Sequence, residues 1–166
     1  MAKKHEDLLY RVKTEKLYPR YLELINELLN RCAAKGHYFI ATSGYRSPEE
    51  QAVLYAKGRT TPGPKVTNAK PFSSDHQFGL ALDFVYDKTF KSEKIDASYD
   101  DKYMKILADE ALLLGLDAGY YWKAIHDSPH ISLNRKKYNV KLKDLENQYK
   151  KGGLQQVFKY LDKFDW

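Results

Sequence analysis

Cysteine is almost absent from this chain of 166 residues, since Cys32 is the only one. A single cysteine excludes an intrachain disulfide and any zinc ribbon or finger built on several thiolates. Because Cys32 falls on the apolar face of a predicted helix, we interpret it as a small buried residue rather than a nucleophile. The chain also lacks internal repeats and low-complexity segments, so we expect one domain covering residues 1–166.

Long hydrophobic runs are missing as well. Residues 1–7 carry charges but no apolar stretch follows them, so neither a classical signal peptide nor a transmembrane span is expected. We therefore expect no stable membrane insertion. The protein should be cytoplasmic in the cell that makes it, until something else releases it.

The composition is that of a globular protein with a basic surface. Hydrophobic residues make up 43% of the chain and charged residues 30%, which excludes a disordered class. The net charge of +6 could attract nucleic acid, anionic membranes or acidic cell-wall polymers. Because no nucleic-acid motif accompanies the charge, we expect no nucleic-acid partner. We also expect a monomer.

Hydrophobic periodicity predicts short strands alternating with helices. The predicted helices cover residues 21–32, 48–57, 103–114 and 154–161, and the predicted strands cover residues 38–41, 80–85 and 130–133. Ser47, Pro48 and Glu50 form a capping-box pattern at the start of the second helix. The sequence predicts a long ordered loop over residues 59–74. It also predicts one or more C-terminal packing helices within residues 141–166. The expected fold class is α+β, with helices flanking a small antiparallel sheet.

Three side chains could bind one divalent metal: His76, Asp83 and His130. Asp83 lies inside an apolar run, where a buried carboxylate costs several kcal/mol unless a cation compensates it. Gly79 allows the backbone to turn between His76 and Asp83. Two histidines and one aspartate leave a fourth zinc position free for water, which distinguishes a catalytic site from a structural one. The chain is therefore expected to be a metal-dependent hydrolase with one Zn²⁺.

Hydrolysis also needs a base and a cationic group near the metal. Asp127 is the candidate general base, placed by an extended segment that leads to His130. Arg46 could stabilise the oxyanion or grip a substrate carboxylate, and a structural salt bridge is its alternative role. His126 and His130 have the spacing of a helical zinc pair, but Pro129 argues against such a helix, so we leave His126 out of the site.

Other polar residues receive simpler interpretations. We interpret His5 and His37 as surface or satisfied core residues. Five acidic side chains could bind calcium in a loop, although a solvated turn is the simpler interpretation; they are Asp87, Glu93, Asp96, Asp100 and Asp101.

The residues of this candidate site resemble the motifs of a known family. The pattern Ser-x-His-(x)6-Asp followed by Asp-x-Pro-His is similar to that of the zinc peptidases that cut D-amino-acid-containing peptides of bacterial cell walls. This family includes D-Ala-D-Ala carboxypeptidases and L-alanyl-D-glutamate endopeptidases, and it shares a fold with lysostaphin-type peptidases and the hedgehog domain. The matching residues are Ser74, His76, Gly79, Ala81, Asp83, Asp127, Pro129 and His130. The segment from Ser43 to Thr60 resembles the endopeptidase branch.

The resemblance implies a set of roles. His76, Asp83 and His130 would be the zinc ligands and Asp127 the general base. Arg46 would contact the substrate, and Ser74 would line the site or orient His76. The implied partner is the peptidoglycan stem peptide, and the implied function is that of a bacteriophage endolysin that cleaves the L-alanyl-D-glutamate bond and lyses its host.

Two other functions stay open within the resemblance. The first is a D-Ala-D-Ala carboxypeptidase or dipeptidase of cell-wall metabolism. The second is a zinc-containing binding domain without catalysis, as in hedgehog-type domains.

Overall fold

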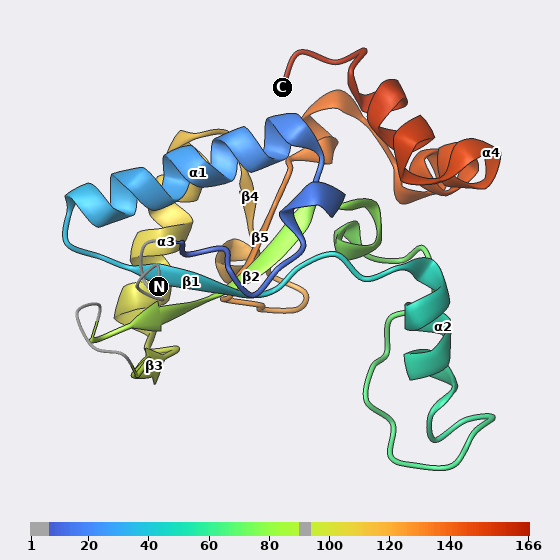
Figure 1. Ribbon diagram of the computed structural model, residues 1–166, viewed down its shortest axis with the longest axis horizontal. Helices are drawn as coiled ribbons and strands as arrows, with labels where there is room; N and C mark the ends of the chain where they lie inside the picture. The colour runs from blue at the N-terminus through green and yellow to red at the C-terminus, as the bar shows by residue number, and fades with distance from the viewer. Residues whose placement is uncertain (1–6, 90–93) are drawn as a thin grey trace.

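The computed structural model describes residues 7–89 and 94–166, so His5 and Glu93 lie outside the described residues. Within these ranges, helices flank a sheet of five short strands (Figure 1). The α-helices are α1 (Pro19–Ala34), α2 (Pro48–Ala56), α3 (Asp101–Leu113) and α4 (Leu142–Leu161), and the strands are β1 (Phe39–Ser43), β2 (Ala81–Asp87), β3 (Ala97–Ser98), β4 (Asp117–Ala118) and β5 (His130–Ser132). Short 3-10 helices are η1 (Thr14–Lys16), η2 (Asp75–Phe78), η3 (Gly119–Tyr121) and η4 (Arg135–Tyr138).

The sheet is antiparallel throughout and is organised around β2. Its strand order is β1-β2-β5-β4, and β3 pairs with the far end of β2. The predicted fold class, a small antiparallel sheet with flanking helices, is therefore confirmed. All three residues of β5 are buried, and the strand forms where the sequence predicts one.

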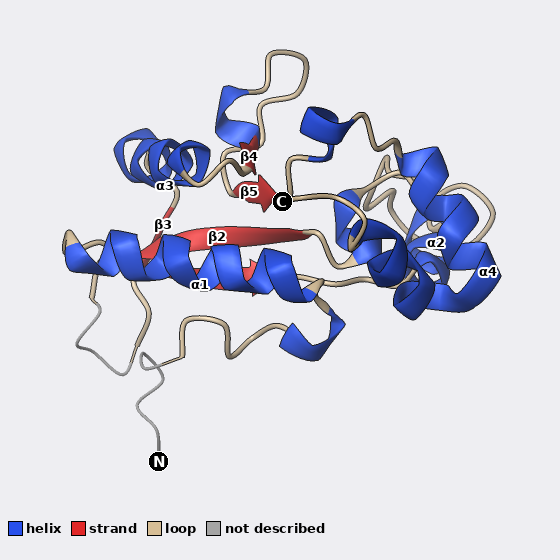
Figure 2. Cartoon of the chain, turned by 90° about the horizontal axis from the view of Figure 1, so that it is seen from above, coloured by secondary structure: helices blue, strands red, loops and turns tan. Residues whose placement is uncertain are grey.

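The core lies between the sheet and the helices α1 and α3. Helix α1 runs along the sheet (Figure 2), and the Tyr21 hydroxyl donates a hydrogen bond of 2.8 Å to the backbone carbonyl of Ile131 in β5. Cys32 is fully buried on the same helix, as expected for a small core residue. Burial raises the pKa of its thiol to about 12, so the thiol stays protonated and unreactive at neutral pH.

Helices α2 and α4 lie at the end of the sheet opposite β3 (Figures 1 and 2). Helix α2 begins with the predicted capping box, because the Ser47 hydroxyl accepts from Glu50 N and the Glu50 carboxylate accepts from Ser47 N. Helix α4 begins earlier than its sequence pattern predicts and is interrupted by non-helical backbone at Gly152 and Gly153. None of the described helices combines the length and apolar character needed to cross a membrane.

A buried carboxylate joins α1 to α3. Glu110 on α3 forms ion pairs with Lys35 and with Arg31, whose Nε lies 3.0 Å from Glu110 Oε2. The Glu110 side chain is only 7% exposed, whereas both cations reach solvent. The ammonium of Lys35 and the guanidinium of Arg31 outweigh the effect of burial and lower the pKa of Glu110 below its ordinary value.

We expect Glu110→Gln to lower the free energy of unfolding by roughly 1 kcal/mol at pH 7, because two ion pairs are lost while their cations stay hydrated. Since the folded pKa of Glu110 lies below its ordinary 4.5, this stabilisation is present above pH 4.5 and disappears as the pH falls through the folded pKa. Urea denaturation at several pH values measures the effect. Glu23→Gln, which removes an exposed ion pair on α1, is the matched control and should change stability little. An equal loss at pH 7 and pH 3 would contradict the assignment.

Candidate metal centre

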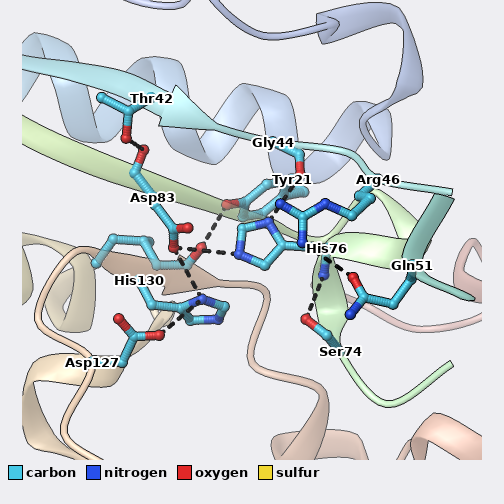
Figure 3. Close-up of polar contacts among 11 residues, drawn as sticks. Tyr21, Thr42, Gly44, Arg46, Gln51, Ser74, His76, Asp83, Asp127 and His130 are labelled. Atoms are coloured by element: carbon cyan, nitrogen blue, oxygen red, sulfur yellow. Dashed lines mark hydrogen bonds and ion pairs between the residues drawn. The ribbon is translucent and has the colours of Figure 1, made fainter. Parts of the chain in front are cut away.

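The pairing of β2 with β5 brings Asp83 and His130 together. The two residues are direct partners in the antiparallel register, so their side chains project from the same face of the sheet. Asp83 Oδ1 lies 3.3 Å from His130 Nδ1 (Figure 3). Residues 47 positions apart in the chain therefore share one site through sheet register alone.

His76 reaches the same carboxylate from η2. Its Nε2 lies 3.3 Å from Asp83 Oδ1, and its Nδ1 lies 2.9 Å from the carbonyl oxygen of Gly44. A carbonyl can only accept, so this bond places the proton on Nδ1 and leaves the lone pair of Nε2 facing Asp83. The turn after η2 requires Gly79, which has φ +69° and whose added Cβ would lie 2.2 Å from the carbonyl oxygen of Lys16.

These three side chains could hold one divalent ion. Each offers a ligand atom, and the three atoms lie within 4.8 Å of one another; no other such group occurs in the described ranges. Two buried atoms, Asp83 Oδ1 and His130 Nε2, have no hydrogen-bond partner among the described residues. A buried carboxylate oxygen that faces two imidazole nitrogens without being satisfied suits a cation between them. The donor set therefore fits zinc.

The carboxylate of Asp83 and the imidazole of His76 shift each other's pKa. Burial alone would raise the pKa of Asp83, but the adjacent His130 and His76 outweigh burial and lower it. Burial alone would lower the pKa of His76, but the Asp83 carboxylate and the Gly44 carbonyl outweigh burial and raise it. Asp83 is thus an anion at neutral pH, the form that binds a metal.

Asp127 lies at the edge of the same site. Its Oδ2 is 3.9 Å from His130 Nδ1, and its side chain is 45% exposed. The predicted extended segment is wrong: residues 127–130 form a turn in which His130 N donates to Asp127 O. Asp127 N also donates to Gly119 O, which ties the turn to η3. The approach is close, since a Cβ on Gly119 would lie 2.3 Å from Asp127 O.

A groove of about 840 Å³ opens onto the three ligand candidates, and both Arg46 and Ser74 line it. The Ser74 hydroxyl accepts a 3.3 Å bond from His76 N, which caps η2. The Nη1 of Arg46 donates to Gln51 Oε1 at 3.1 Å, and Arg46 forms no ion pair within the part of the chain that is described. A structural salt bridge is therefore not its role among those residues, and its remaining donors are available to a ligand.

Two contacts near the site had no signal in the sequence. Gln51 is 2% exposed and is fixed by the carbonyl of Ala69, which accepts from its Nε2 at 2.7 Å. Asp75 forms a two-point ion pair with Arg135, which ties η2 to the segment after β5. Sequence spacing does not predict either contact, because the paths of the loop of residues 57–74 and of the turn at 133–135 decide which residues meet.

Residues that we left out of the site lie elsewhere. The ring of His126 packs on Tyr120, with ring centroids 5.3 Å apart. His37 contacts the hydroxyl of Tyr86. Asp87 accepts hydrogen bonds from Thr89 and from the backbone of Asp96, as in an ordinary polar turn.

Comparison with known proteins identifies the class. The family model described as VanY, D-alanyl-D-alanine carboxypeptidase, matches residues 14–131. The peptidoglycan L-alanyl-D-glutamate endopeptidase CwlK of Bacillus subtilis (strain 168) is 34% identical over 123 residues, which are 70% of this chain and 73% of that protein.

Solved structures share the fold at lower identity. The L-Ala D-Glu endopeptidase ChiX of Serratia marcescens aligns with a TM-score of 0.51 and 22% identity, covering 84% of this chain and 92% of that one. The D,D-pentapeptidase VanY of a VanB-type resistance cassette, solved with Zn(II), aligns with a TM-score of 0.53 and 20% identity over 87% of this chain and 83% of that one. The LD-carboxypeptidase LdcB aligns with a TM-score of 0.54 and 21% identity, covering 86% of this chain and 68% of that one.

A groove that ends on a His-Asp-His donor set, carried by an antiparallel sheet of this topology, defines the chain as a metallopeptidase. More narrowly, the chain belongs to the VanY family. The prediction of a zinc cofactor is confirmed by this membership together with the donor set.

We expect Gly119→Ala to weaken zinc binding about 10–100-fold, because the new methyl group displaces the turn that carries Asp127 and His130. Competition with a chromophoric chelator measures the affinity. Ala33→Gly in α1 is the control, since it costs about 1 kcal/mol of helix stability far from the ligands and should leave zinc affinity unchanged. Equal affinities for Gly119→Ala and wild type would show that the turn does not position the site.

Proposed function

We propose that this chain is a zinc-dependent peptidoglycan peptidase that cleaves the L-alanyl-D-glutamate bond of the stem peptide. The observation that carries the choice of bond is the 34% identity to CwlK over most of both chains. We further propose that residues 1–166 act as a single peptidase domain, with residues 141–166 as its packing helices.

His76, Asp83 and His130 hold the ion in this proposal. The Gly44 carbonyl fixes the tautomer of His76, and the strand register fixes Asp83 against His130. Bound zinc supplies a Lewis acid for the scissile carbonyl and lowers the pKa of a coordinated water to about 7.

Asp127 serves as the general base. Its carboxylate lies beside His130, and its side chain is 45% exposed and lines the groove, so it can reach both a water and a substrate. It takes the proton of the attacking water and later delivers that proton to the leaving amine. Residues 122–125 form the groove wall beside it.

Arg46 and Ser74 act on the substrate. Gln51 accepts a hydrogen bond from one nitrogen of the Arg46 guanidinium, and Arg46 lines the groove with its other donors free of ion pairs among the described residues. Those donors can stabilise an oxyanion or grip a carboxylate in two-point fashion. Ser74 lines the groove, and its hydroxyl orients His76 by accepting a hydrogen bond from the backbone N–H of His76.

A D-Ala-D-Ala carboxypeptidase is the second candidate, and the description of the matching family model favours it. The same three ligands, base and arginine would serve that reaction equally well. A binding domain without catalysis is less favoured, because Asp127 stands at the edge of the ligand set with an accessible carboxylate.

We also propose that the enzyme acts as a phage endolysin, a monomer that reaches the wall only after the inner membrane is opened. The net charge of +6 supports attraction to anionic envelope material.

The bond is tested by mass spectrometry of stem peptides after digestion. Wild type should expose a new N-terminal D-glutamate, and Asp127→Asn should lower kcat by about 10²–10⁴ while it still binds one zinc. His126→Ala, a change on the same loop, is the control and should retain activity. Release of terminal D-alanine without new D-glutamate termini would favour the carboxypeptidase instead.

The endolysin role is tested inside cells. Bacteria that express the chain should stay intact until chloroform permeabilises the inner membrane, and lysis should then be rapid and depend on Asp127. Lysis before permeabilisation, or equal lysis with Asp127→Asn, would contradict the proposal.

A further inference from the structure

The two candidate reactions share their reacting atoms. In both, the residue on the leaving side is a D-amino acid that presents the scissile nitrogen and, one carbon away, a free carboxylate. The two leaving residues differ in the side chain attached to that carbon. D-alanine carries a methyl group, whereas D-glutamate of a stem peptide carries a two-carbon arm that is amide-linked to a diamino acid. Bond choice therefore depends on whether the site has room for this arm, and not on the metal ligands.

A second cavity, of about 450 Å³, lies beside the main groove. Arg46 and Ser43 line both, so the two spaces adjoin at the arginine. The second cavity is also lined by three residues of α2: Glu50, Val53 and Leu54.

We propose that this second cavity is a leaving-side subsite that receives the side-chain arm of D-glutamate and the diamino acid attached to it. This inference rests on the proposed function and adds the part of the substrate that the catalytic groups do not touch.

The position of Arg46 supports the assignment. Its Nη1 is engaged by Gln51 while the side chain lines both spaces. The carboxylate and the arm start from the same carbon of the leaving residue. A carboxylate bound to Arg46 in the groove therefore brings the root of the arm to the junction with the second cavity.

The lining of the cavity suits the arm. Val53 is 64% exposed although it is apolar, and with Leu54 it offers a surface for methylene groups. Glu50 adds a negative charge, and its carboxylate is held in place by a 2.9 Å bond from Ser47 N. A carboxylate in the same lining as the apolar side chains matches the amino group of a diamino acid.

The test compares two peptides, L-Ala-D-Glu and L-Ala-γ-D-Glu-L-Lys, which differ only in the continuation of the arm. Val53→Trp fills the cavity from an exposed position, so it should fold normally. We expect it to lower the ratio of kcat/KM for the tripeptide to that for the dipeptide at least tenfold. Leu113→Trp adds the same bulk on α3, at a residue that is 69% exposed, and should leave the ratio at its wild-type value.

A second variant tests the charge. Wild type should prefer the tripeptide with a free lysine ε-amine over its ε-acetylated form by several-fold, and Glu50→Gln, which keeps the helix cap, should abolish that preference. If wild type cleaves both peptides and Val53→Trp leaves their ratio unchanged, the subsite is wrong and the proposed function stands. If wild type cleaves neither peptide and instead releases D-Ala from a D-Ala-D-Ala terminus, the proposed function is wrong and the subsite with it.

Discussion

A carboxylate placed in the interior of a sheet is the constraint on which this structure depends. Asp83 sits in a strand whose neighbouring residues are buried, and its Oδ1 faces His76 and His130 at 3.3 Å each. Such a group is costly to bury unless opposite charge surrounds it. Register brings His130 to it, and the turn at Gly79 brings His76 to it. The fold thus holds a carboxylate beside two imidazoles, an arrangement that suits a bound cation.

The parts of the fold that follow from local pattern could be predicted from the sequence. The capping box at Ser47 and the strand around Asp83 are examples. The convergence of the three ligand candidates is predicted from their residue types and motif, and the pairing of β2 with β5 contributes to it. Contacts decided by loops could not be predicted. The turn at residues 127–130 is attached to η3 by a backbone bond to Gly119, and the Asp75–Arg135 ion pair joins segments 60 residues apart. Neither follows from periodicity or spacing.

The C-terminal helix braces the loop that leads into the site, although it lies beyond the residues that match the family model. Phe72 adopts φ +64°, an unusual conformation for a large side chain, and its ring packs edge-on against Tyr149 of α4 with centroids 5.5 Å apart. The buried Gln77 accepts a bond from Phe72 N. These contacts tie the loop that precedes η2 to α4 and to η2 itself.

The central claim is that three side chains from η2, β2 and β5 bind one metal ion and leave a position for water. X-ray absorption spectroscopy of the zinc-loaded protein tests it most directly, together with the zinc content of His76→Ala, Asp83→Ala and His130→Ala. The account predicts one zinc per chain, two imidazoles and only oxygen otherwise in the coordination shell, and loss of tight binding in each variant. A sulfur ligand, a third imidazole, or zinc retained at full occupancy in any of the three variants would contradict it.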